Sequence, residues 1–499
     1  MRRIAPFILA AALSVVLADR APAQDAGPTV TLVSGPVLTL DDAIRLALQK
    51  NKVLKVASYG PGISRANLLV ARGAFDPSLA ATRSYSVTQF NSSYSLIPVV
   101  ANTKTDYYTV AIQGLLPIGT QYQVGGNTTE VRETLDGLST YYDTFGGFNV
   151  TQPLLKGFGF DANLVNVRIA KANRSISDLV YRQSAIDTIT FVVEAYSNLQ
   201  LAHDQLDSAE RASALAASLL AENEKEYKIG SISQSDVIQA RANRAQYEEP
   251  ILIAERAVRD AQNSLRELIG EDVFFENEPL FTLVPAPVPD ITVDRRTDLE
   301  RALVTRPDYQ QARLGIAKDR YSESYAVNAL LPEVDFTGGY GYSGVANTFS
   351  ASRQQVQDHL YPSTSAGLSV TIPLTFAVGR GNLRAARLQR AQAEEDLKRL
   401  AADIAVAVAA ADGQIETTRK RVAADQAAYA LAKQALEAEE KKKKAGTSST
   451  LYVVQEQQFV ASIENNLSFA LASQRQAVAV YDQTLGTTLE RYHIKFTDD

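Results

Sequence analysis

The residues that most often catalyse reactions or bind metals are few in this chain and do not cluster. Among its 499 residues there are three histidines and no cysteine. His203, His359 and His493 lack the spacing of metal ligands, so we expect packed or solvated histidines rather than a metal site. Gly379 and Gly381 flank an arginine without the third glycine of a dinucleotide-binding motif, and we expect them to bend the chain between a strand and a helix. The sequence therefore predicts no catalytic, cofactor-binding or metal site, and no enzyme.

Two turn sequences are better candidates for function. Lys228 precedes Gly230, a residue that can take a positive φ at the end of a helix. Ser233 is followed three residues later by Asp236, a capping-box pattern that predicts the start of a returning helix. A second turn, residues 441–449, repeats the cationic end, the glycine and the serine without the acidic partner. Both turns are expected to be the tips of helical hairpins.

Long helices must position these two turns. No proline or glycine occurs between Asp161 and Lys228, and at 1.5 Å per residue this stretch would extend roughly 100 Å. Leu383 to Lys443 would extend roughly 90 Å, with one glycine tolerated inside. Apolar residues recur at heptad spacing on both stretches: Val192, Leu199, Leu206, Leu220 and Tyr227, then Ile415, Val422, Tyr429 and Leu436. Helices of this length are expected to pack as a coiled coil or an α-barrel.

The chain is also an internal repeat. Five landmarks recur in the same order in both halves, which a proline-rich linker, Pro279 to Pro289, separates. These pairs are Ala47-Leu48 with Ala302-Leu303, Pro77 with Pro332, Pro153 with Pro373, Gly230 with Gly446, and Gly270 with Gly486. Each half therefore runs helix, strands, long helix, turn and second helix.

Alternating side chains predict the strands. Phe336, Tyr340 and Val370 are expected to share one face of a sheet, with Thr337 and Thr371 on the other. A soluble β-sandwich has the same alternation. The tyrosines and the small polar residues opposite them favour a membrane barrel, with its apolar face toward lipid and its polar face toward a wet lumen.

The amino-terminal residues predict export. Arg2 and Arg3 precede an apolar stretch, and Ala21-Pro22-Ala23 offers a cleavage site, so residues 1–24 read as a signal peptide. A membrane anchor is the alternative, but the apolar stretch is too short to span a bilayer. A cysteine-free exported chain has no disulfides and is not a lipoprotein. A net charge of −6 gives no indication of nucleic-acid binding.

These patterns predict the following organisation. After the signal peptide come a first repeat (36–270), a proline-rich linker (271–297), a second repeat (298–486) and a C-terminal tail (487–499). In the first repeat, strands are expected at about 78–153 and a long hairpin at about 158–269, with its tip near 230. In the second repeat, strands are expected at about 333–374 and a hairpin at about 380–485, with its tip near 446.

The motifs LDDAIRLALQKN, FDPSL, QPLLKGFG and GSISQSDVIQAR, in this duplicated order, resemble the TolC family of outer-membrane efflux proteins over nearly all of the mature chain. The resemblance implies a mainly α fold with a transmembrane β section. It also implies a homotrimer in which each protomer gives four strands to a twelve-stranded β-barrel in outer-membrane lipid. A periplasmic α-helical barrel would continue that β-barrel.

As a function, the resemblance implies a passive exit duct of a tripartite efflux pump or type I secretion system. Its partners would be a periplasmic adaptor and an inner-membrane transporter. The alternative is a periplasmic coiled-coil adaptor, which would have one hairpin and a lipoyl-like pair of half-motifs; an envelope enzyme is the third possibility. Drugs, metals, polysaccharide and protein would all pass through such a lumen.

One departure from the family is the longer first strand section. Pro77 and Pro153 are much farther apart than Pro332 and Pro373. The surplus lies around GLLPIGTQYQVGGNTTEVRE, where a proline and a glycine suggest a turn. We expect an enlarged extracellular loop; an extra strand hairpin is the alternative.

The family closes its periplasmic end through polar contacts at the hairpin tips. Asp236 matches the family's acidic position after the first turn, and its simplest role is helix capping, alone or together with gating. At the second-half positions that are acidic in some members this chain has Tyr452 and Gln455, so an acidic ring is not supported. Ser448 and Lys443 stand where the family has an arginine and a tyrosine. The candidate gate residues are Asp236, Lys228, Gly230, Lys443, Gly446, Ser448, Tyr452 and Gln455.

Overall fold

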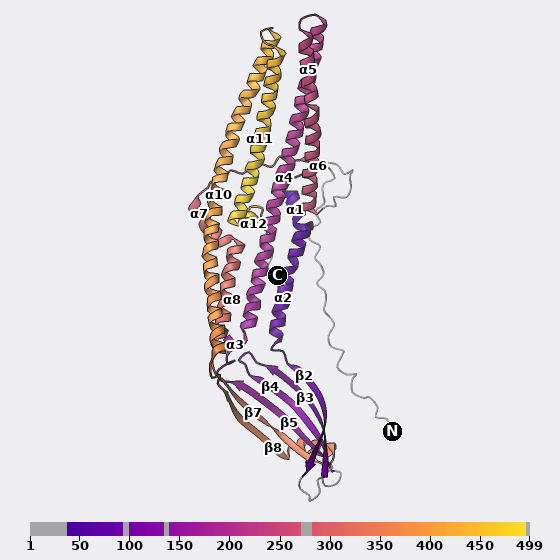
Figure 1. Cartoon of the computed structure of the whole chain (residues 1–499), viewed down its shortest axis with the longest axis vertical. Helices are drawn as coiled ribbons and strands as arrows, with labels where there is room; N and C mark the ends of the chain where they lie inside the picture. The colour runs from indigo at the N-terminus through magenta and orange to yellow at the C-terminus, as the bar shows by residue number, and fades with distance from the viewer. Residues whose placement is uncertain (1–36, 93–98, 134–138, 271–281, 496–499) are drawn as a thin grey trace, which may run out of the picture.

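The computed structural model describes residues 37–92, 99–133, 139–270 and 282–495. It consists of long helices that run side by side and a curved sheet at one end of them (Figure 1). The expected signal peptide, 1–24, lies outside the described residues, as do the first part of the expected linker and the last four residues. In the described ranges no helix combines the length and the apolar character needed to cross a membrane.

Two helical hairpins form the long section. The first hairpin consists of α4 (Val165–Lys228), α5 (Gln234–Gln246) and α6 (Glu248–Ile269). The second consists of α10 (Ala377–Lys444) and α11 (Thr450–Leu485). With 64 and 68 residues, α4 and α10 are each about 100 Å long. Shorter helices flank the hairpins: α1 (Leu40–Lys50), α2 (Lys52–Gly73), α3 (Phe160–Asn163), α7 (Arg295–Thr305), α8 (Pro307–Ala329) and α12 (Thr488–Arg491).

Local sequence explains where these helices break. The returning helix of the first hairpin divides at Tyr247, because Pro250 has no amide hydrogen for the helical ladder and crowds the carbonyl four residues earlier. The expected bend at Gly379 and Gly381 is wrong, because both glycines lie inside α10. The bend is one turn earlier, at Phe376, whose φ is 50°. A Cβ on Gly379 would lie 2.9 Å from Leu330, so that glycine allows α10 to pack closely against the end of α8.

The sheet has six antiparallel strands in the order β2-β3-β4-β5-β7-β8. The first repeat provides β2 (Ser78–Ser92), β3 (Val99–Leu115), β4 (Gln121–Glu133) and β5 (Ser139–Pro153). The second repeat provides β7 (Glu333–Ala346) and β8 (Tyr361–Thr371), with the short helix α9 (Phe349–Gln357) between them. The contact between β5 and β7 joins the two repeats.

The expected enlarged loop is wrong, and so is the expected number of four strands. The surplus residues of the first repeat form the hairpin of β3 and β4. Its turn is closed by hydrogen bonds from the Gly119 amide to the Leu116 carbonyl (2.8 Å) and from the Leu116 amide to the Thr120 carbonyl (2.8 Å). Gly119 has a φ of +96°, which glycine adopts without strain. Both strands have a further hydrogen-bonding neighbour, β2 beside β3 and β5 beside β4, which an open loop would not have.

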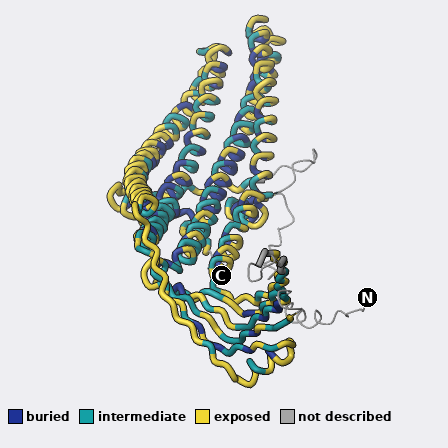
Figure 2. The backbone as a smooth tube through the Cα atoms, turned by 60° about the horizontal axis from the view of Figure 1, so that its bottom comes forward, coloured by how far each residue is buried: buried dark blue, intermediate teal, exposed yellow. Residues whose placement is uncertain are grey.

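The densest core lies halfway along the helices, where α1, α4 and α6 meet. Tyr196 is almost fully buried there, and its hydroxyl donates to the carbonyl oxygens of Leu38 (3.0 Å) and Val284 (2.7 Å). These carbonyls belong to or follow the short parallel strands β1 (Val37–Leu38) and β6 (Thr282–Leu283). In Figure 2 the hairpins beyond this core carry buried positions only at intervals among exposed ones.

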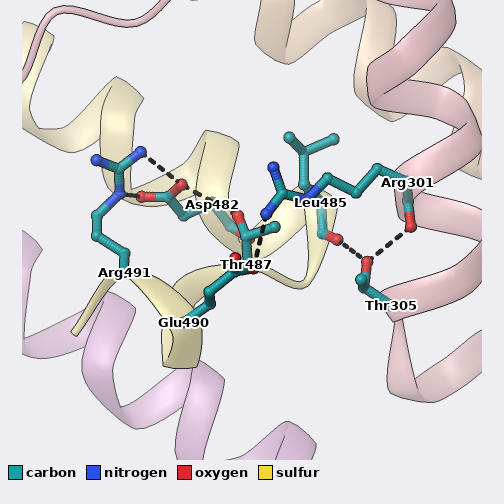
Figure 3. A network of polar contacts seen from close by, with 7 residues as sticks. All are labelled: Arg301, Thr305, Asp482, Leu485, Thr487, Glu490 and Arg491. Carbon is teal, nitrogen blue, oxygen red and sulfur yellow. Dashed lines mark hydrogen bonds and ion pairs between the residues drawn. The ribbon is translucent and has the colours of Figure 1, made fainter. Parts of the chain in front are cut away.

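A polar network fastens the end of the chain to this middle region (Figure 3). Arg491 of α12 donates through both arms of its guanidinium to Asp482 of α11, one of these bonds being 2.9 Å long. Asp482 is 2% exposed, and burial raises the pKa of its carboxyl while Arg491 acts in the opposite direction. Nearby, Arg301 of α7 pairs with Glu490 at 2.6 Å.

Replacing Arg491 with alanine is expected to destabilise this region strongly. The change leaves the Asp482 carboxylate buried without its cation, which costs roughly 3–5 kcal/mol. Arg296→Ala is the matched control, because Arg296 is 88% exposed and pairs only with its helix neighbour Glu300, a contact worth about 0.5 kcal/mol or less. Thermal unfolding followed by circular dichroism measures both variants, and equal shifts would contradict the role assigned to Arg491.

Candidate functional site

Both hairpin tips have the glycine-terminated geometry that their sequences predict. After α4, the Gly230 amide bonds to the Tyr227 carbonyl at 3.0 Å, and Gly230 has a φ of +79°. After α10, the Gly446 amide bonds to the Lys443 carbonyl at 2.9 Å, and Gly446 has a φ of +73°. A Cβ on either glycine would meet open space, so backbone conformation rather than crowding requires glycine here.

The capping box at the first tip is confirmed. Asp236 accepts hydrogen bonds from the Ser233 amide (3.1 Å) and hydroxyl (2.6 Å), and its own amide donates to the Ser233 hydroxyl (3.3 Å). At the second tip Ser449 precedes α11 but makes no side-chain capping bond. The two tips therefore share their glycine turn but not their cap.

A buried asparagine joins the two hairpins just inside the tips. Asn223 of α4 is fully buried, and its amide nitrogen donates to the Thr450 hydroxyl of α11 (3.1 Å) and to the Asp236 carbonyl of α5 (3.4 Å). Its amide oxygen accepts from the ammonium of Lys443 in α10 (3.1 Å). One side chain thus contacts α5, α10 and α11 from α4. We call Asn223, Lys443 and Thr450 the tip junction.

Lys443 brings a charge into the tip junction. Its side chain is only 9% exposed, although it lies in a run of four lysines at the end of α10. Glu222 and Glu226 of α4 place carboxylate oxygens 3.6 Å and 3.9 Å from its ammonium. The second hairpin therefore inserts a cation against the first, where two carboxylates and an amide oxygen stabilise it.

Farther from the tips, Glu464 of α11 makes a second polar connection between the hairpins. It accepts from Arg211 (2.9 Å) and Ser208 (3.0 Å) of α4 and from the Tyr429 hydroxyl of α10 (3.0 Å). Together with the tip junction and the apolar cluster of Leu219, Leu436, Val453 and Val454 that lies between them, it holds the two hairpins together.

The other candidate residues lie outside the tip junction. Lys228 is exposed, and in the described part of the chain no ion pair joins it to Asp236. Tyr452 and Gln455 are exposed on α11. Ser448 donates to Glu439, and this bond together with Lys442 lowers the pKa of that carboxyl.

Sequence reasoning missed Asn223, Thr450, Glu222 and Glu226. A signal for Asn223 was present, because it lies seven, four and three residues after Ala216, Leu219 and Leu220, which are all buried and share one helix face with it. A polar residue on an otherwise apolar seam is typical of a position that sets the register between helices. The partners of Asn223 come from three other helices, which no local pattern reveals.

The sheet has one apolar and one polar face, as predicted. Strand register places Phe336, Tyr340 and Val370 on one face and Thr337 and Thr371 on the other. The apolar face continues across all six strands at the end nearer the helices, where its large side chains are exposed: Leu79, Val110, Ile112, Val124, Phe148, Phe336, Leu368 and Val370.

The same face changes character toward the far end of the strands. Tyr108 lies beside Arg83, which pairs with Asp106 at 2.6 Å, and Glu130 pairs with Arg132. The helix α9 packs on this face through a hydrogen bond between the hydroxyls of Ser352 and Thr144 at 2.8 Å. The face therefore passes from apolar through tyrosine-rich to charged with distance from the helices.

The structure does not bring the three histidines together in the part of the chain that it describes. His203 lies in α4, His359 follows α9 and His493 follows α12, far apart in the chain. Within the described ranges no three histidine, aspartate or glutamate side chains are grouped as a metal site requires. The two features that the geometry offers for function are the sheet, with its apolar and polar faces, and the two hairpins that polar contacts connect near their tips.

Known proteins share this architecture. The family model described as Outer membrane efflux protein matches residues 43–271 and 299–487. Outer membrane protein TolC of Vibrio cholerae is 23% identical over 353 residues, which are 69% of this chain and 77% of that protein. The solved outer-membrane channel OprN superposes with a TM-score of 0.67 at 17% identity, covering 90% of this chain and 89% of that one. The Campylobacter jejuni CmeC outer membrane channel superposes with a TM-score of 0.63 at 17% identity, covering 92% and 87%.

Asn223→Ala is expected to loosen the hairpin ends. It leaves the Lys443 ammonium and the Thr450 hydroxyl without their buried partner, at a cost of roughly 1–3 kcal/mol. Hydrogen exchange of the backbone amides near residues 216–240 and 440–460 should therefore accelerate. Arg241→Ala is the matched control, because that side chain is 64% exposed and its pair with Glu224 contributes about 1 kcal/mol at most. Unchanged exchange in Asn223→Ala would show that the tip junction does not hold the hairpins together.

Proposed function

The chain belongs to the outer membrane efflux protein family, and from that premise we propose that it works as a homotrimeric, passive exit duct that crosses the outer membrane and the periplasm. The observation that carries this proposal is the sheet, which is apolar on one face, polar on the other and joined end to end with helices about 100 Å long. A protein with those surfaces can line a wet path through lipid and extend that path away from the membrane.

The edges of the sheet support assembly with other copies. Within the described sheet, β2 and β8 each have a strand neighbour on one side only. Backbone groups in a bilayer need hydrogen-bond partners, so these edges must meet strands of other protomers to form a closed β-barrel. The hairpins would then form a helical barrel below it in the periplasm.

A passive duct needs partner proteins that drive export. A duct of this family has no energy source of its own, so an inner-membrane transporter and a periplasmic adaptor would drive export, in a tripartite efflux pump or a type I secretion system. Residues 1–24 would be removed as a signal peptide, and without a cysteine the mature chain would carry no lipid anchor. The alternative function, in which this chain is itself the periplasmic adaptor, is less well supported. An adaptor would have one hairpin, whereas this chain has two hairpins and a membrane-compatible sheet.

The gate would lie at the hairpin tips. Opening requires the second hairpin to move away from the first, and Lys443 with Glu222 and Glu226 opposes that movement within each protomer. Asp236 would add a capping and gating role if its carboxylate also meets the cationic ends of neighbouring protomers. Each such contact is weak, but a threefold assembly repeats it three times.

Membrane insertion through the apolar face can be tested with two adjacent residues of β8. Leu368→Arg places a charge on the apolar face and is expected to cost roughly 2–4 kcal/mol, which reduces the amount of trimer in the outer-membrane fraction. Ser369→Arg places the same charge on the polar face and should leave the trimer yield nearly unchanged. Cross-linking of outer-membrane extracts measures both. Equal yields, or a wild-type chain found as a soluble monomer, would refute the duct.

Removing tip charges is expected to open the channel. Lys443→Gln removes the ion pairs with Glu222 and Glu226, while Asp236→Asn keeps a capping oxygen and loses the charge. At about 1 kcal/mol per protomer, three protomers change the ratio of open to closed channels on the order of 100-fold. Single-channel conductance in planar bilayers should rise at low salt and differ less from wild type at high salt. Lys444→Gln, an exposed neighbour, is the control. A variant that conducts like wild type at low salt, with its trimer intact, has no part in the gate.

A further inference from the structure

The hairpin of β3 and β4 changes the size of the barrel that this chain can form. It lies inside the sheet, between β2 and β5, and is not an appendage at an edge. β3 pairs with β2 over Ser78–Ser92, and β4 pairs with β5 over Gln121–Glu133, so both strands are fully hydrogen-bonded. Any barrel that keeps this sheet intact must include both strands.

We propose that three copies of the chain close into a β-barrel of eighteen strands, six from each copy, with a lumen wider than twelve strands can enclose; this rests on the proposed trimeric duct. Neighbouring strands are antiparallel throughout the described sheet, and six is an even number. The last strand, β8, therefore runs opposite to β2. Each seam between copies can form an ordinary antiparallel ladder without any rearrangement.

Strand number sets the radius of the barrel. With strands about 4.8 Å apart and tilted by about 40°, twelve strands give a backbone radius of about 12 Å and eighteen give about 18 Å. The cross-section of the lumen is therefore roughly doubled.

The helical section matches the wider barrel. Four long helices of each chain, α2, α4, α8 and α10, directly precede a strand or follow one, α4 after the single turn of α3, and they contact one another in that order. Three copies of the chain would therefore bring twelve long helices to the end of the sheet, which Figure 1 shows below them. A ring of twelve helices about 9.5 Å apart has a radius of about 18 Å. Eighteen strands continue this ring without a step, whereas twelve strands would narrow it.

Two features of the sheet bear on how open this lumen is. Glycines occur on the polar face at Gly125, Gly147, Gly341 and Gly367, but the Phe145 ring on the same face lies over Gly147 and Gly341. The helix α9 packs against Thr144 and Gly344, which belong to the opposite face. In the proposed barrel α9 would therefore lie outside the lumen and would not narrow it.

Electron cryomicroscopy of the detergent-purified trimer counts the strands directly. Eighteen strands around a lumen with a backbone radius near 18 Å are the expected result. A trimer whose barrel has twelve strands would overturn the wide barrel and leave the proposed function standing. A preparation that contains no trimer would overturn both.

Thiol labelling tests the place of the extra hairpin independently, because the natural chain has no cysteine. Gln123→Cys and Val124→Cys are neighbours on β4 with side chains on the polar and the apolar face. In membrane-embedded trimer, a water-soluble maleimide should label Gln123→Cys at least ten times faster than Val124→Cys. Equal labelling rates would show that the hairpin lies outside the barrel wall and would overturn the proposal. Trimer yield measured on the same samples reports separately on the proposed function.

Discussion

The unpaired backbone of the two edge strands is the constraint on which the rest of the assembly depends. Amide and carbonyl groups of β2 and β8 need partners, and lipid offers none. A single six-stranded sheet is too narrow to curl and satisfy its own edges, so the proposed barrel requires further copies. In that assembly the helices that continue from the sheets would also be held in a ring.

Different interactions hold the two helical hairpins together. Small apolar clusters, one around Leu219 and Val453 and one around Leu220 and Val237, alternate along them with buried polar contacts. Asn223 and Lys443 illustrate this, because each would be costly to bury alone and neither is unsatisfied in the tip junction. Polar contacts of this kind specify one arrangement while contributing modest net stability. That combination suits the proposed gate, in which the two hairpins would separate during export.

The middle region provides the rigidity that the ends lack. The large apolar cluster around Tyr196 and the Asp482–Arg491 pair hold the two repeats and the chain end together. Burial raises the pKa of the Tyr196 hydroxyl to about 12, and this hydroxyl acts as a donor to two carbonyls from distant segments. This packed region would therefore separate the proposed gate at the tips from the sheet.

Patterns that repeat within a few residues determined much of this protein from sequence alone. Heptad spacing predicted the long helices, alternation predicted the two faces of the sheet, and Ser233 with Asp236 predicted the cap. Only the tertiary structure decided the rest. The strand character of the surplus segment depended on neighbours that β2 and β5 provide, and the bend at Phe376 depended on packing between α10 and α8. The tip junction required Asn223, Lys443 and Thr450 to meet across more than 200 residues, and local propensity contains no information about such contacts.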